Sequence, residues 1–481
     1  MEQPLGSTHS ADGRMKRPLT ESDIERKVRA YCRWTCAVKK KVPEKRRNVP
    51  FSVMSYNVLA QENLDNHPEL YRHCNPDHLA WSFRRERIIN YVKLCACEII
   101  CLQEVQEEHL YQYIGPVLRE DGYNFTYIKK TGEKVEGCAI FWQVGLFKLE
   151  AVKFVEMRVP GCRVMTRDNV GLVVMLSVVR NPRVKLVVAT THLLFNPRRG
   201  EMKLAQLRYL LAEVEEMAYL GTCEKEPMNP VYMPILLCGD LNMTPFCPLY
   251  NFIVEGRLSL DGLTHGEIGG KSGGPLISAE EIRAGGLLPC TMHKLQFTMR
   301  YHLDPVLVME RERVNKIVYH MLGKFKSCYS HRKRDAPEVT AYSDDPGTVD
   351  YMFFQRSSLL THVSMMNVMT LSELEKIGGL PNAFMGSDHL PLVARFVLRP
   401  IPEDVLATGL PLCAGDLKAS LAICVTNRRH RPRFASGRNA DGVVVKGGSL
   451  WPNASHSSRS AITVFSAASA RSFTTNSLTR T

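Results

Sequence analysis

Residues 236–245 read LLCGDLNMTP, an apolar run that ends on two polar side chains, Asp240 and Asn242. The short apolar run PILLC before them is typical of a strand that is covered on both faces. Carboxylate and carboxamide groups resist burial unless a cation or a hydrogen-bond donor replaces their water. The stretch therefore predicts a buried strand whose end carries groups that need such a partner.

Other apolar runs of the chain carry polar groups in the same way. FSVMSYN ends on Asn57, IICLQE ends on Glu104 and VVATTH ends on His192. TVDYMFF contains Asp350, and GSDH at residues 386–389 precedes the apolar run PLVARFVL. Six core segments thus bring one or two carboxylate, carboxamide or imidazole groups to a strand or its edge, which chance would not favour. The pattern indicates one shared site.

Four of these residues are acids: Glu104, Asp240, Asp350 and Asp388. If they converge, their lost hydration and mutual repulsion must be offset by a cation or by donors. Mg²⁺ or Mn²⁺ fits best, because both are hard cations that prefer oxygen ligands. Zinc is the poorer choice, since the set holds only two histidines and needs no cysteine.

Each residue also has a simpler interpretation when it is taken alone. Asn57 could be a turn residue that bonds its own backbone, and Glu104 and Asp240 could be caps or exposed acids at strand ends. His192 could be a core histidine, and residues 388–389 could be a loop pair that faces solvent. All of these interpretations would have to hold at once, so the joint pattern favours a functional site.

The composition is that of a soluble globular protein, with 481 residues of which 44% are hydrophobic and 23% charged. No apolar stretch reaches the roughly 20 residues of a membrane span, and the N-terminus lacks the charged-then-apolar order of a secretory signal. The 15 cysteines are scattered, several in apolar segments, as expected for buried thiols in a reducing compartment. We expect a cytoplasmic or nuclear protein without membrane insertion.

Charge and hydrophobic pattern divide the chain into three regions. Residues 1–50 carry 13 Lys and Arg against 6 Asp and Glu, and residues 399–481 carry 11 against 4. We expect a basic, partly disordered lead with a short amphipathic helix, and a basic, low-complexity, disordered tail. These ends either hold a phosphate-rich partner or are simply solvated. Residues 51–398 form the predicted catalytic domain, with a loop insertion at about 256–346.

Six short motifs follow one another along this domain: SYN at 55–57, LQE at 102–104, TTH at 190–192, GDLN at 239–242, VDYMFF at 349–354 and SDHLP at 387–391. In their order and spacing the chain resembles the exonuclease-endonuclease-phosphatase superfamily. Within it, FSVMSYNVLAQ, CLQEVQEEH and THLLFNPRRGEMKLAQL resemble the Angel proteins, relatives of nocturnin and the catalytic poly(A) nucleases. The resemblance implies an α/β (α+β) fold, a four-layered αββα sandwich of the deoxyribonuclease I-like type.

The resemblance also implies metal-dependent hydrolysis of a phosphoester by water. Glu104 is the expected principal Mg²⁺ ligand, with Asn57 and Asp388 completing or supporting the metal site. Asp240 would position and deprotonate the attacking water, and Asn242 would hold that water or a phosphate oxygen. Carboxylate action on a water within hydrogen-bond reach is consistent with these roles.

Two histidines complete the expected site. His389, with its ring fixed by Asp350, would stabilise the charge that grows on the phosphoryl oxygens, and His192 would contact the phosphate. The expected substrate-binding residues are Asn169, Arg198 and Arg199. The two arginines could instead cap the helix that follows them.

Angel-like segments imply the 3′ end of RNA as substrate. Our first hypothesis is a 3′-to-5′ exoribonuclease, as in removal of poly(A), and our second is an RNA 2′,3′-cyclic phosphate phosphatase. A third hypothesis, of another class, is a catalytically inactive RNA-binding adaptor that uses its basic ends in ribonucleoprotein assembly. Expected partners are RNA and ribonucleoprotein, translation or decay factors, with Mg²⁺ (or Mn²⁺) as cofactor and no DNA substrate.

Overall fold

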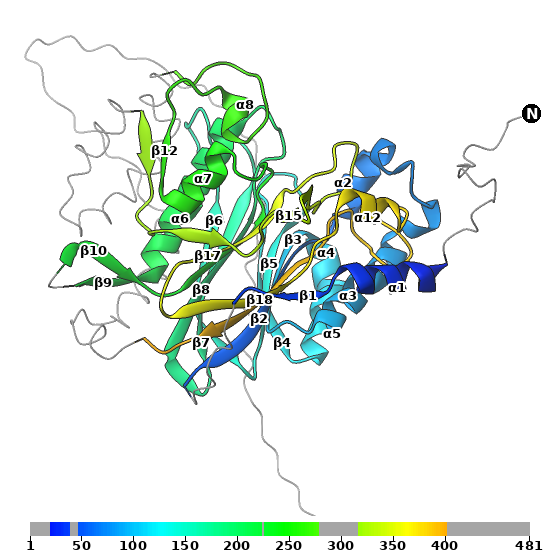
Figure 1. The fold of residues 1–481 in the computed structure, drawn as a ribbon, viewed down its shortest axis with the longest axis horizontal. Coiled ribbons are helices and arrows are strands. Elements are labelled where there is room, and N and C mark those ends of the chain that lie inside the picture. The colour runs from blue at the N-terminus through cyan, green and yellow to red at the C-terminus, as the bar shows by residue number, and fades with distance from the viewer. Residues whose placement is uncertain (1–19, 39–46, 224–225, 279–315, 402–481) are drawn as a thin grey trace, which may run out of the picture. The chain divides into compact units, whose positions relative to one another are not determined.

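The computed structural model describes residues 20–38, 47–223, 226–278 and 316–401, which lie in one structural unit. Two mixed β-sheets pack face to face, and helices cover their outer faces (Figure 1). This arrangement confirms the predicted four-layered αββα sandwich. Among the described residues, no helix is long and apolar enough to cross a lipid bilayer.

The first sheet has seven strands in the order β1-β18-β19-β2-β3-β5-β4. Their bounds are β1 (Trp34–Cys36), β2 (Val49–Asn57), β3 (Ile99–Gln106), β4 (Tyr123–Lys129), β5 (Glu136–Gln143), β18 (Leu360–Met366) and β19 (Leu392–Leu398). The second sheet has six strands in the order β14-β17-β11-β8-β7-β6. Their bounds are β6 (Phe147–Glu156), β7 (Val170–Val178), β8 (Asn181–His192), β11 (Ile235–Asp240), β14 (Phe325–Ser327) and β17 (Asp350–Gln355).

Helices lie beyond both sheets (Figure 1). The first sheet is covered by α1 (Glu21–Tyr31), α3 (Trp81–Cys95) and α5 (Gly115–Glu120), and the second by α6 (Gly200–Ala218) and α7 (Pro248–Glu255). The shorter helices are α2 (Gln61–Asn66), η1 (Pro68–Tyr71), η2 (Pro76–His78), α4 (Glu107–His109), η3 (Leu110–Ile114), α8 (His265–Ile268) and α12 (Leu371–Glu375). The remaining short strands are β9 (Tyr219–Cys223), β10 (Glu226–Tyr232), β12 (Arg257–Ser259), β13 (Ile317–Tyr319), β15 (Arg332–Lys333) and β16 (Ala336–Pro337).

Strand β11 shows why the apolar runs are continuous. Leu236 and Cys238 face the core between the two sheets, whereas Ile235 and Leu237 face the core beneath α6 and α7. Side chains alternate between the faces of a strand, so a strand with a hydrophobic core on each side needs apolar residues at every position. The quoted run is therefore buried on both faces, as its sequence predicted.

Strand pairing brings the polar strand ends to one edge of the sandwich. β2 and β3 run parallel, and Asn57 pairs with Gln103. β8 and β11 also run parallel, and Asp240 pairs with His192. β17 runs antiparallel to β11, so its first residue, Asp350, lies opposite Asp240. Residues that are distant in sequence thus become neighbours at this edge.

The two ends of the predicted catalytic domain differ in how they fold. α1 confirms the predicted amphipathic helix, since Ile24 and Val28 are buried, and β1 adds a strand beside β18. Residues 20–38 are thus part of the sandwich, and a domain boundary at residue 50 stays a prediction. The predicted disordered tail from residue 402 onward lies outside the described residues.

The predicted loop insertion at about 256–346 is partly integral to the fold. β14 pairs with β17 in the second sheet, and the side chains of Phe325, Cys328 and Tyr329 are buried. The Tyr329 hydroxyl donates to the carbonyl of Val393 at 3.0 Å. Such short strands give no sequence periodicity, which explains why the stretch resembled a surface loop. Residues 279–315 of this stretch lie outside the described residues.

We predict that Gly239→Ala destabilises the fold. Gly239 has φ +142°, and a Cβ atom there would lie 2.1 Å from the carbonyl oxygen of Thr191 on β8. Strain at such a φ costs about 1–3 kcal/mol, so with the steric clash we expect the free energy of unfolding in urea to fall by at least about 2 kcal/mol. Gly145→Ala is the matched control, because a Cβ there meets nothing within 4 Å. Equal stability of the two variants would contradict this account.

Candidate active site

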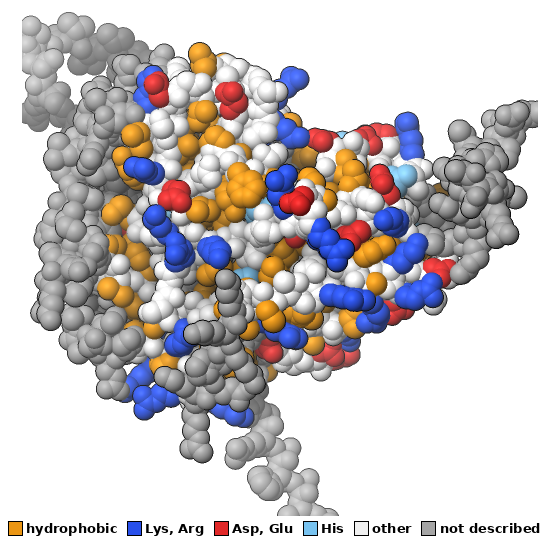
Figure 2. Space-filling view, in the orientation of Figure 1, with side chains coloured by type: hydrophobic (Ala, Val, Ile, Leu, Met, Phe, Trp, Pro, Cys, Tyr) orange, Lys and Arg blue, Asp and Glu red, His pale blue; other side chains and the backbone are white. Residues whose placement is uncertain are grey.

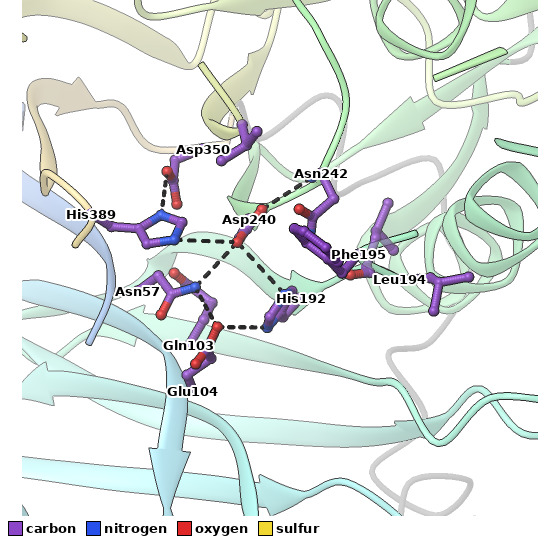
Figure 3. Close-up of polar contacts among 12 residues, drawn as sticks. Asn57, Gln103, Glu104, His192, Leu194, Phe195, Asp240, Asn242, Asp350 and His389 are labelled. Carbon is purple, nitrogen blue, oxygen red and sulfur yellow. Dashed lines mark hydrogen bonds and ion pairs between the residues drawn. The ribbon is translucent and has the colours of Figure 1, made fainter. Parts of the chain in front are cut away.

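The polar strand ends gather in one buried cluster. Figure 3 shows Asn57, Glu104, His192, Asp240 and His389 turned toward one another at the edge where their strands end. Asn57 is at its centre, because its Nδ2 atom donates to Glu104 Oε1 at 3.0 Å and to Asp240 Oδ2 at 3.1 Å. One amide therefore bridges acids from the two sheets.

Glu104 is aimed at the cluster by a local distortion of its strand. The pairing of β3 with β5 shifts register between Leu102 and Val105, and Glu104 has a φ of +56°. A bulge of this kind re-aims a side chain. Oε2 of Glu104 accepts from the Ala60 amide at 3.0 Å and from Asn63 Nδ2 at 2.7 Å. Both donors lie in the segment that follows β2.

The pKa of Glu104 is lowered by the groups around it. Burial by itself would raise this pKa, but the neighbouring imidazole of His192, the Asn57 amide and Lys130 more than offset it. Glu104 is therefore ionised at neutral pH, as a ligand for a hard cation must be.

The pKa of Asp240 is shifted in the opposite direction. Burial first, and then the negative charge of Asp350, raise the pKa of Asp240 to about 7. Its Oδ1 accepts from the Asn242 amide at 3.0 Å, so the carboxylate is held in place. Asn242 itself has a φ of +48°, and its side chain donates to the carbonyl of Leu193 at 3.1 Å. A fixed carboxylate with a pKa near neutrality is suited to accept a proton.

His389 forms a dyad with Asp350. Its Nδ1 atom lies 2.8 Å from Asp350 Oδ2, and its Nε2 atom lies 3.9 Å from Asp240 Oδ2. Burial opposes a charge on the ring, but Asp350 and Asp388 raise the pKa of His389 well above its ordinary value. The imidazolium therefore presents Nε2–H to the centre of the cluster.

His192 closes the other side of the cluster. Its Nδ1 atom lies 3.7 Å from Glu104 Oε1, and its Nε2 atom lies 3.6 Å from Asp240 Oδ2. Burial and the charge of Lys130 lower the pKa of His192 to about 3, so this ring is neutral at pH 7. Within the described part of the chain, its buried Nδ1 atom makes no hydrogen bond. That atom is free to meet a ligand.

The donor set fits a divalent cation that prefers oxygen. Two groups have ligand atoms within 4.8 Å of one another, namely Glu104 with His192 and Asp240, and Asp240 with Asp350 and His389. Asp388 adds a fourth buried acid beside His389. Four buried acids beside one imidazolium leave negative charge that a cation would offset. The Nδ1 atom of His192, which has no hydrogen-bond partner among the described residues, is a further atom that could bind the ion.

Two further residues of the cluster escaped the sequence analysis. The Tyr71 hydroxyl donates to Asp388 Oδ2 at 2.9 Å, and Asn63 donates to Glu104 as described above. Both lie in the helical segments that follow β2, far from any strand end. A search for polar groups at strand ends could not find them.

The expected substrate-binding residues lie around the cluster in different ways. Asn169 is buried, and its amide donates to the carbonyl of His192 at 2.9 Å, so it also braces that strand end. Arg198 is exposed on the loop before α6. Arg199 is directed to Glu201 through a close contact of its Nε atom. The structure therefore places Asn169 beside the cluster, whereas the two arginines lie on the adjoining loop.

Family comparison agrees with this geometry. The model of the Endonuclease/Exonuclease/phosphatase family matches residues 54–389. The chain belongs to this family. The match spans nearly the whole cluster, from the strand that ends on Asn57 to His389, so the predicted superfamily resemblance is confirmed.

Individual relatives confirm the resemblance to the Angel proteins. Protein angel homolog 2 of Danio rerio is 38% identical over 380 residues, with 73% of this chain and 64% of the relative covered. The Homo sapiens protein of that name is 36% identical over 389 residues, with 72% and 69% covered. The chain thus spans about two thirds of the length of these relatives. A crystal structure of ANGEL2, described as a 2′,3′-cyclic phosphatase in complex with adenosine-2′,3′-vanadate, superposes with a TM-score of 0.63 at 35% identity, covering 76% of this chain and 98% of that one.

We predict that Asp350→Asn lowers the pKa of His389. Loss of a carboxylate at 2.8 Å from Nδ1 removes the principal support of the imidazolium, and we expect a fall of about 1–3 pH units. The ring of wild-type protein then stays charged to a higher pH than the ring of the variant. Histidine NMR titration of metal-free protein measures this difference.

His362 is the internal control for that titration. Burial lowers the pKa of His362 to about 4, and Asp350 does not contribute to that shift. Its titration should be the same in both proteins. Identical titration of His389 in wild type and variant would contradict the proposed dyad.

Proposed function

We propose that this protein is a metal-dependent phosphoester hydrolase that opens the 2′,3′-cyclic phosphate at the 3′ end of RNA. The observation that supports this proposal most is that a carboxylate and an imidazolium face each other across one buried cluster. Asp240 is a fixed carboxylate with a pKa near neutrality, and His389 is an imidazolium supported by Asp350. A base that faces a cationic hydrogen-bond donor is the arrangement that attack of water on a phosphoryl group requires.

In the proposed reaction, Asp240 accepts a proton from the attacking water as the oxygen bonds to phosphorus. One bond between phosphorus and a ribose oxygen breaks, and that oxygen takes up one proton, which balances the proton that Asp240 accepts, so that water is consumed and a phosphate monoester remains. His389 donates a hydrogen bond to the phosphoryl oxygen on which charge grows. His192, with Nε2 3.6 Å from Asp240 Oδ2, faces the same space and contacts the phosphate. Asn242 holds the water or a phosphate oxygen.

We further propose Mg²⁺ as the ion at this site, with Mn²⁺ able to replace it. Glu104 is the principal ligand, and Asn57 and Asp388 complete or support the coordination. The ionised state of Glu104 and the oxygen-rich donor set support this choice. When bound, the ion supplies positive charge that polarises the phosphoryl group and offsets the acids.

The solved ANGEL2 structure bears on the choice between the two reactions. The solved ANGEL2 relative is a cyclic phosphatase, which favours this second hypothesis of the sequence analysis over the first. Stepwise 3′-to-5′ removal of nucleotides remains the other candidate, because the same cluster can hydrolyse a phosphodiester. Both reactions need RNA held near the rim, where Arg198 is exposed and Phe195 is 76% exposed, three residues beyond His192.

RNA contacts outside the cluster are proposed to come from individual side chains. Figure 2 shows Lys and Arg side chains spread over the face in view, with Asp and Glu between them. A mixed surface of this kind favours local contacts with phosphate. Ribonucleoprotein, translation or decay factors as partners, and residence in the cytoplasm or nucleus, stay predictions. The geometry of the cluster speaks against the inactive adaptor, because it holds a carboxylate suited to act as base, the pair of His389 and Asp350, and acids that could hold a metal ion.

We predict that purified protein with Mg²⁺ converts an RNA that ends in a 2′,3′-cyclic phosphate in a single terminal step. Asp240→Ala should slow this step by about 100- to 10,000-fold, the usual contribution of a general base. Asp261→Ala is the matched control, because Asp261 is an exposed acid paired with Lys316. Gel electrophoresis resolves the products.

An RNA that ends in poly(A) is the comparison substrate. A ladder of shortened products from it would support the exonuclease instead. If neither RNA changes in a metal-dependent way, the adaptor hypothesis stands and the enzymatic proposal fails.

We also predict that Glu104→Gln weakens Mg²⁺ binding by at least about tenfold. The change keeps the size of the side chain but removes the ionised oxygen that faces Asn57 and His192. Titration calorimetry with MgCl₂ measures the affinity, and Glu338→Gln, which alters a buried acid outside the cluster, serves as control. Unchanged affinity in Glu104→Gln would refute the assigned ligand.

A further inference from the structure

Two cationic side chains are fully buried beneath the active-site loops. Arg84 on α3 is 0% exposed and Lys203 on α6 is 1% exposed, and both rank among the largest fully buried side chains of the described structure. Charged groups of this kind are rarely fully buried, because loss of their water is costly. They lie on opposite sides of the sandwich, one behind each sheet.

Arg84 joins the two loops of the first sheet that carry site residues. Its Nη1 atom donates to the carbonyl of Val58 at 3.2 Å and to that of Gly386 at 2.9 Å, and its Nη2 atom donates to the carbonyl of Leu59 at 2.9 Å. Val58 follows Asn57, and Gly386 lies two residues before Asp388. The contact is tight, since a Cβ on Gly386 would lie 2.5 Å from the carbonyl oxygen of Arg84.

Lys203 makes the corresponding connection in the second sheet. Its Nζ atom donates to the carbonyl of Asn242 in a close contact and to that of Phe195 at 3.4 Å. Gln206, one turn further along the same face of α6, accepts from the Leu194 amide at 3.1 Å. The loop after His192 and the loop after Asp240 are thus both anchored to α6.

Arg84 and Lys203 therefore make the same kind of contact. Each bonds backbone carbonyls of two loops that are distant in sequence, and each of those loops carries or directly follows a residue of the cluster. Arg84 has five donors in a fixed fork, which suits several acceptors at once: it also donates to the carbonyl of Leu79 and to Gln61 Oε1, whereas Lys203 is a point charge with three donors. Their hydrogen bonds go to neutral oxygens, so their positive charge remains to act on the acids of the cluster.

We propose that Arg84 and Lys203 are positioning residues, which hold the loops bearing Asn57, Asp388, His192 and Asn242 in register and offset the charge of the clustered acids before metal binds. This inference rests on the proposed function for its effect on turnover. Its effects on the loops and on Mg²⁺ affinity do not depend on which phosphoester is cleaved. Neither residue touches the reacting atoms; each acts through the backbone of loops that adjoin the residues of the cluster.

Lys203→Met tests the inference, because it keeps the length of the side chain and removes the charge and the donors. We expect hydrogen–deuterium exchange to accelerate in residues 193–196 and 241–244, and Mg²⁺ affinity and kcat on the cyclic-ended RNA each to fall about 10- to 100-fold, as for loss of an outer-shell partner. KM should change less than kcat. Lys333→Met is the matched control, because Lys333 also donates to two backbone carbonyls, of Tyr31 and Val368, away from the cluster.

Arg84→Lys is the second variant, and it decides the matter if Lys203→Met does not fold. It keeps the charge but has fewer donors, so exchange should accelerate at residues 58–61 and 384–387 and Mg²⁺ affinity should fall. Wild-type exchange and affinity in a folded variant would overturn the inference. If wild-type protein cleaves neither RNA, the proposed function fails, whereas exchange and calorimetry still report on the positioning role.

Discussion

The cost of burying acids at one edge of the sandwich is the constraint on which the site depends. Glu104, Asp240, Asp350 and Asp388 would each retain water at a protein surface, yet all four are buried here. Each has its own hydrogen-bond partners: Glu104 and Asp240 accept from amides, Asp350 pairs with an imidazolium, and Asp388 accepts from a tyrosine hydroxyl. Burial raises the pKa of both Glu104 and Asp240, but His192, Asn57 and Lys130 more than offset this at Glu104, whereas the charge of Asp350 adds to it at Asp240. Glu104 therefore stays ionised, and Asp240 is suited to its proposed role as base.

Backbone strain is concentrated at the same edge. Glu104 and Asn242 both have positive φ, and Gly239 in β11 has a conformation that side chains rarely adopt. Such strain persists only where surrounding structure over-determines it. The parallel pairing of β8 with β11, the bulge in β3 and the bonds from α6 supply that surrounding structure.

The two sheets contribute different parts of the chemistry, which accounts for a site at the sandwich edge. The first sheet supplies the proposed metal ligands Asn57 and Glu104, and the second supplies the proposed base Asp240 together with His192. Asn57 joins the two halves through one amide that donates to both acids. A shift of one sheet against the other would break that link, so packing of the central core and geometry of the site are coupled.

The sequence by itself determined the fold class and most of the cluster. Strands buried on both faces must be apolar throughout, so polar groups at the end of such a run, within it or just before it stood out. Asn57, Glu104, His192, Asp240, Asp350 and His389 were found in this way. Short strands such as β14 were missed because three residues carry no periodicity. Tyr71, Asn63, Arg84 and Lys203 were missed because they lie on helices, where no strand end marks them. Only the tertiary structure decided their roles, since a hydrogen bond to a carbonyl of another loop, or a pKa set by a neighbour some hundred residues away, depends on how the two sheets and their helices pack.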